Sequence, residues 1–111
     1  YDAIPSEVKR VSHRCAVDVV GCMLGGAGSG LDPLSKYMNN NHDVDGGEDC
    51  TVFSNGQLKE HTSPAVAAFA NAFAAHALDF DDNCYAGMVH GTATVFPAAL
   101  AAAQSSGAPW P

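Results

Sequence analysis

The sequence has little positive charge. Five Lys and Arg residues stand against twelve Asp and Glu residues in 111 positions, so the formal net charge is −7 with neutral histidines. Nucleic acids and anionic membrane surfaces attract basic proteins, so we expect neither of them as a partner. No apolar run approaches the roughly 18 residues that a membrane span needs, and the polar first residues do not predict a signal peptide.

Cysteines are few and widely spaced. The four cysteines form no CxxC pair and have no spacing with histidine that is typical of a zinc site. Cys15 and Cys22 fall on one face of a predicted helix, where we interpret them as small buried hydrophobic residues. The pattern differs from that of a disulfide-dense small domain, so we expect a reduced, cytoplasmic chain.

The sequence of the N-terminal half predicts one long helix, one short helix and an exposed loop. The long helix begins near Pro5 and ends in the glycine-rich stretch 25–30, which lacks the lysine and preceding strand of a nucleotide-binding loop. Helical spacing predicts one buried face, formed by Val8, Val11, Cys15, Val19 and Cys22. A short helix is predicted over 32–39. The acidic stretch 39–49 lacks the ligand pattern of a calcium loop, which favours a solvated loop.

A β-hairpin is predicted between residues 51 and 59. Two strand-like segments flank Ser54, Asn55 and Gly56, which form a strong turn signal. A hairpin alone is marginally stable, so we expect it to lie on the helices. In the helix that follows, Asn71 is expected to be buried and to hydrogen-bond the backbone or a neighbouring loop.

Two alanine-rich helices make up most of the C-terminal half. The first has Ser63 as its N-cap and Pro64 as its first residue, and its apolar residues on nearly all sides predict burial on most sides. The second is expected over about 91–104, where Pro97 kinks it or shortens its first half. The predicted fold class is mainly α, a helical-bundle fragment with one small β-hairpin.

Between these helices, three carboxylates crowd together and a histidine follows. Asp79, Asp81 and Asp82 lie at or beyond a helix C-terminus, where the helix dipole disfavours negative charge. An acidic surface loop with an ordinary histidine is one interpretation, in which two of the carboxylates face water or cap the next segment. The other is that one carboxylate and His90 form an acid/base pair in a cleft. The aspartates alone are a weak metal signal, so we expect no metal site.

Several motifs resemble those of the MmgE/PrpD family, which includes 2-methylcitrate dehydratase, cis-aconitate decarboxylase and iminodisuccinate epimerase. They are Ala67-Ala68-Phe69-Ala70-Asn71, His76-Ala77-Leu78-Asp79-Phe80-Asp81-Asp82, and His90 before Ala93-Thr94-Val95-Phe96-Pro97-Ala98-Ala99-Leu100. The resemblance implies that residues 1–111 are the N-terminal portion of an all-helical domain in a longer, usually dimeric enzyme. A second, α+β domain is then expected beyond residue 111.

The resemblance also implies a chemistry and a set of site residues. Enzymes of this family move a proton at a carbon beside a carboxylate of a small di- or tricarboxylate, and none of them has an established cofactor requirement, so we expect no cofactor. Asp79 and His90 match active-site positions, and Asn83 stands where many members have Thr. Four further residues are expected to bind substrate or to shape and hydrate the loop: His76, Asp81, Asp82 and Tyr85.

Two further expectations concern the branch of the MmgE/PrpD family that the chain resembles and the activity of the isolated chain. Gly91 follows His90 where dehydratase-like members have Pro, and the stretch 83–87 is similar to that of the iminodisuccinate epimerase branch. An epimerase is therefore favoured, then a dehydratase or decarboxylase. We expect the isolated 111 residues to be inactive, because five cations are too few to bind such a substrate. The alternative is a non-catalytic helical association module that forms homo-oligomers.

Overall fold

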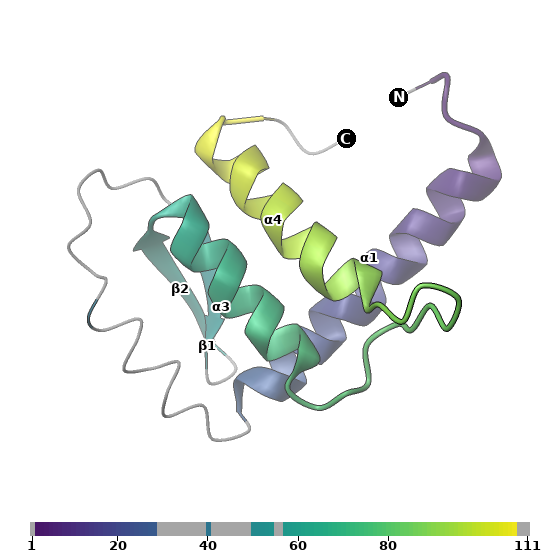
Figure 1. The fold of residues 1–111 in the computed structure, drawn as a ribbon. Coiled ribbons are helices and arrows are strands. Elements are labelled where there is room, and N and C mark those ends of the chain that lie inside the picture. The colour runs from purple at the N-terminus through teal and green to yellow at the C-terminus, as the bar shows by residue number, and fades with distance from the viewer. Residues whose placement is uncertain (1, 29–39, 41–49, 55–56, 109–111) are drawn as a thin grey trace.

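The computed structural model describes residues 2–28, 40, 50–54 and 57–108 (Figure 1). The helix predicted over 32–39 lies outside these ranges, as does nearly all of the loop predicted over 39–49. The described elements are α1 (Ser6–Ala27), β1 (Cys50–Ser54), β2 (Gln57–Thr62), α3 (Pro64–His76) and α4 (Gly91–Ser105). The mainly α fold with one antiparallel hairpin is therefore confirmed. Within the described ranges, no helix is both long and apolar enough to cross a membrane.

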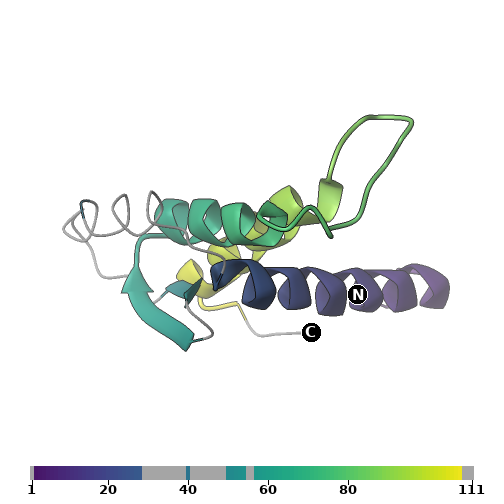
Figure 2. The ribbon, with the colours of Figure 1, turned by 90° about the horizontal axis from the view of Figure 1, so that it is seen from below.

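Helices α3 and α4 lie side by side and run in opposite directions, and α1 crosses them (Figure 1). The N-terminal half of α1 extends past both helices (Figure 2). This arrangement explains why only part of the predicted apolar face is buried. Val19 and Cys22 are in the core, whereas Val8 and Val11 are 50% and 46% exposed. Helix α1 ends at Ala27, inside the glycine-rich stretch, as predicted.

The hairpin is held on the helices by a buried amide. Asn71 of α3 is 1% exposed. Its Oδ1 accepts a hydrogen bond from the Phe53 N–H (2.9 Å), and its Nδ2 donates one to the Thr51 carbonyl (2.8 Å). Gln104 of α4 accepts from the Thr51 N–H (3.0 Å) and donates to the Thr51 hydroxyl (2.7 Å). The expectation for Asn71 is confirmed, since both polar ends of its amide bind strand backbone.

Helices α3 and α4 begin and end much as predicted, and α3 is exposed on one side. The Ser63 hydroxyl caps α3 by accepting from the Val66 N–H (3.4 Å), and Pro97 is accommodated inside α4. Most of α3 is buried or half-buried, as predicted, but one side is open, where Phe69 and Phe73 are 50% and 43% exposed. The centroids of these two rings lie 6.3 Å apart on this partly exposed side of α3.

Helix α1 approaches α3 closely at Gly26. A Cβ at this position would collide with the Ala74 carbonyl oxygen and would lie 3.2 Å from the Ala77 Cβ. Small residues on both helices therefore set the distance between the helix axes. This contact fixes the end of α3, and with it the start of the acidic loop, against α1.

We expect Gly26→Ala to destabilise the fold by about 1–3 kcal/mol, because the added methyl group must push α1 away from α3. Gly21→Ala is the matched control: it lies in the same helix with nothing within 4 Å of the added Cβ, and it should gain about 0.5–1 kcal/mol. Urea unfolding followed by circular dichroism measures both. Equal stability of the two variants would contradict the close helix contact.

Candidate active site

The loop between α3 and α4, residues 77–90, turns sharply at its start. Asp79 has a φ of 54°, in the left-handed region that Asp and Asn tolerate better than most residues. Farther on, Cys84 and Val89 form an isolated antiparallel bridge. The tip of the loop projects away from the helices (Figure 2). The turn at Asp79 brings the chain back, so that Asp81 faces the ends of both helices.

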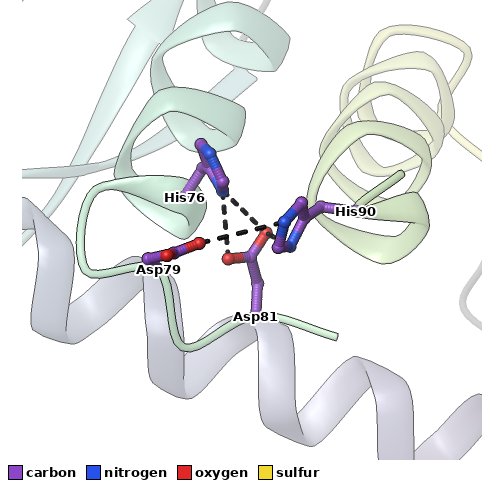
Figure 3. A group of neighbouring side chains, drawn as sticks. All are labelled: His76, Asp79, Asp81 and His90. Atoms are coloured by element: carbon purple, nitrogen blue, oxygen red, sulfur yellow. Dashed lines mark hydrogen bonds and ion pairs between the residues drawn. The ribbon is translucent and has the colours of Figure 1, made fainter. Parts of the chain in front are cut away.

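Asp81 is the centre of a cluster of two histidines and two carboxylates (Figure 3). Its side chain is 1% exposed. Its Oδ1 and Oδ2 lie 3.1 Å and 3.2 Å from His76 Nδ1, and Oδ2 lies 3.2 Å from His90 Nδ1. One buried carboxylate therefore contacts a histidine from the last turn of α3 and a histidine that precedes α4.

His90 lies between the two carboxylates of the cluster. Its Nδ1 atom is buried next to Asp81, but in this orientation it forms no hydrogen bond with any described residue. Its Nε2 atom lies 3.8 Å from Asp79 Oδ1, and the Asp79 side chain is 79% exposed. The imidazole thus has a buried side toward Asp81 and an accessible side toward Asp79. Its ring centroid is 4.6 Å from that of His76.

Asp82 has a structural role in the loop. Its Oδ1 accepts a hydrogen bond from the Thr92 N–H (3.0 Å), and its Oδ2 accepts one from the Thr92 hydroxyl (2.8 Å). Thr92 is in the first turn of α4, whose N–H groups have no partner within the helix. Asp82 therefore caps α4, which agrees with one of the roles expected for the carboxylates.

In the described part of the chain, histidines are the only basic side chains that contact the carboxylates of the cluster. Among the described residues, no Lys or Arg forms an ion pair with Asp79, Asp81 or Asp82. The neighbouring thiol of Cys22 in α1 responds to this charge. Burial raises its pKa, and the carboxylates of Asp18, Asp81 and Asp82 raise it further. Cys22 is therefore a neutral thiol at physiological pH, which argues against a nucleophilic role.

A pocket of about 510 Å³ lies beside the cluster, between α3 and α4. Apolar side chains form most of its wall, and the two histidines of the cluster also line it. The apolar residues include Phe69, Ala72, Phe73, Val89 and Ala93. The pocket is therefore a low-polarity space with imidazole groups in its wall, and we call it the α3–α4 pocket.

The structure brings together four of the seven site residues expected from the sequence: His76, Asp79, Asp81 and His90. The exposed Asn83 and Tyr85 lie outside this cluster, and neither forms a hydrogen bond with any residue in the described ranges. The expected hydration of Asp81 is wrong, because helix ends and two imidazoles enclose its carboxylate.

The aromatic wall of the pocket was not expected from the sequence. Burial on most sides was predicted for the helix that carries Phe69 and Phe73. Their spacing with His76 places all three on one side of α3, and this periodicity was the available signal. The spacing alone does not distinguish a pocket wall from a core face.

The MmgE/PrpD N-terminal domain model matches residues 1–109. The chain therefore belongs to the MmgE/PrpD family, a family of dehydratases and isomerases. Comparison with curated protein sequences and with solved structures finds no significant match.

Proposed function

We propose that this chain contributes the Asp79–His90 pair to an enzyme that moves a proton at a carbon beside a carboxylate of a small di- or tricarboxylate. The observation that carries the proposal is the two-sided environment of His90. Its Nδ1 lies 3.2 Å from a buried carboxylate, and its Nε2 lies 3.8 Å from the exposed carboxylate of Asp79. His90 itself lines the α3–α4 pocket. A positioned imidazole of this kind suits general acid–base catalysis.

The three groups have complementary roles in this proposal. His90 Nε2 exchanges the proton with the substrate carbon, and Asp79 is the second proton carrier. Asp81 stabilises the positive charge that His90 gains when it takes up the proton, and it fixes the imidazole near the pocket. His76 shares the Asp81 carboxylate and lines the same pocket, so it positions the pair rather than reacting.

The α3–α4 pocket is suited to the carbon skeleton of the substrate. Among the described residues that line it there is no Lys or Arg, and the nearby carboxylates repel an anionic ligand. The carboxylates of the substrate therefore need cations from outside the described residues, in a second α+β domain or another subunit. For the same reason the isolated 111 residues should not turn over substrate.

Within the family, we favour epimerisation of the iminodisuccinate type over dehydration or decarboxylation. The reason is the sequence around the cluster, with Asn83 in place of Thr and Gly91 in place of Pro. Epimerisation needs only removal and return of one proton, which two carriers such as His90 and Asp79 provide. Dehydration and decarboxylation also require a departing group to be stabilised.

In the complete enzyme, Asp79→Asn and His90→Gln should each lower turnover by about 10²–10⁴-fold, because each removes one proton carrier. Asn tolerates the left-handed backbone of position 79, so the fold should be kept. Deuterium exchange from solvent into the carbon beside the carboxylate, followed by NMR, measures the shared proton-transfer step. Inversion without loss of water or carbon dioxide identifies the epimerase.

The control for this experiment is His13→Gln, an exposed histidine on α1 that lies outside the cluster. It should exchange deuterium at the wild-type rate. Wild-type rates in both Asp79→Asn and His90→Gln would contradict the proposed roles.

A second candidate function is supported by the exposed apolar surface. Phe69, Phe73 and Val89 are 50%, 43% and 50% exposed, and Phe80 and Met88 of the loop are 78% and 90% exposed. Large exposed apolar patches mark association sites. The chain would then be a non-catalytic helical module that forms homo-oligomers through this surface.

This candidate predicts that the 111-residue chain is a dimer or a larger oligomer in size-exclusion chromatography with light scattering. Phe69→Ser and Phe80→Ser should shift it toward monomer, because they remove apolar area from the surface. The matched control is Val17→Ser, since Val17 is 76% exposed on α1. A folded wild-type monomer would contradict the association module and leave the catalytic proposal unaffected.

A further inference from the structure

We propose that the cluster of His76, Asp79, Asp81 and His90 binds one divalent transition-metal ion of the Zn²⁺ type. With one ligand atom taken from each residue, all four atoms lie within 4.8 Å of one another. The residues come from two helix ends and the loop between them, and their side chains converge on one point (Figure 3). The inference concerns metal uptake by this chain and does not rest on the proposed reaction; an ion bound here would occupy Asp79 and His90, so they could not carry protons while it is bound.

The distances in the cluster suit a tetrahedral ion. Zn²⁺ binds imidazole nitrogen and carboxylate oxygen at about 2.0–2.2 Å, so the ligand atoms of a tetrahedral site lie about 3.4 Å apart. The Nδ1 atoms of His76 and His90 each lie 3.2 Å from Asp81 Oδ2, close to this value. The four ligand atoms lie within 4.8 Å of one another, so the site would have to contract around the ion.

Two further observations point to a cation. His90 Nδ1 is buried and forms no hydrogen bond with any described residue, which leaves a polar atom available at the centre of the cluster. The Asp81 carboxylate is also buried, and among the described residues no Lys or Arg offsets its charge. A bound divalent ion would satisfy both atoms and neutralise both carboxylates.

The ligand types favour one class of metal. Two imidazoles with two carboxylates suit Zn²⁺, Co²⁺ or Ni²⁺, whereas Mg²⁺ and Ca²⁺ prefer sites built from oxygen atoms alone. The aspartates alone did not predict a metal site. The fold adds His76 and His90 to Asp79 and Asp81, which gives a mixed set of nitrogen and oxygen ligands.

The test is isothermal titration of the 111-residue chain with ZnCl₂, with MgCl₂ as the comparison ion. We expect one Zn²⁺ per chain and no saturable heat with Mg²⁺. His76→Gln and Asp79→Asn should each weaken Zn²⁺ binding at least about tenfold. Both side chains are largely exposed, at 55% and 79%, so their replacement should leave the fold intact, which circular dichroism checks.

Two matched variants separate the cluster from other possible ligands. His13→Gln removes a histidine outside the cluster, and Cys84→Ser removes the exposed thiol of the loop. Both should bind Zn²⁺ like the wild type. A Co²⁺ complex should show visible ligand-field absorption without the near-ultraviolet band of thiolate ligation. Absence of saturable Zn²⁺ binding, or wild-type affinity in both His76→Gln and Asp79→Asn, would overturn the proposal.

Discussion

The burial of one carboxylate, Asp81, is the constraint on which the candidate site depends. A buried carboxylate is costly unless charged or hydrogen-bonding groups surround it; here His76 hydrogen-bonds Asp81, and the His90 imidazole lies 3.2 Å away. His76 comes from the end of α3 and His90 from the residue before α4. The requirement to pair Asp81 therefore holds the two helix ends together and fixes both imidazoles at the α3–α4 pocket.

The surrounding fold makes this burial possible. Small residues allow α1 to approach α3 closely at Gly26 and Ala74, so α1 lies against the start of the loop. The left-handed turn at Asp79 then reverses the chain, and Asp82 ties the end of the turn to α4 through Thr92. The three crowded aspartates thus have three separate environments: one is exposed beside His90, one is buried between histidines, and one caps a helix.

Much of the fold follows from local sequence. Helical spacing predicted α1, α3 and α4 close to their observed bounds, and the start of α3 followed from Ser63 and Pro64. The turn signal at residues 54–56 predicted the hairpin. The extent of burial was less predictable, because apolar spacing shows which face of a helix can be buried but not whether a partner covers it. Val8, Val11 and Phe69 are examples of such uncovered residues.

The candidate site was predictable only in part. The pairing of Asp79 with His90 was expected from motifs, and the structure places these side chains 3.8 Å apart. The role of Asp81 was not, because three neighbouring aspartates look equivalent in the sequence. The backbone turn at Asp79 and the packing of Asp81 against His76 and His90, which the sequence does not show, distinguish the enclosed carboxylate.

A double-mutant cycle between Asp81 and His90 tests most directly whether the buried carboxylate organises the site. The free energy of unfolding is measured in urea for the wild type, Asp81→Asn, His90→Gln and the double variant. If the carboxylate and the imidazole stabilise each other, the cycle should give an interaction energy of about 0.5–3 kcal/mol. Strictly additive losses would show that the two residues act independently, and would contradict the account.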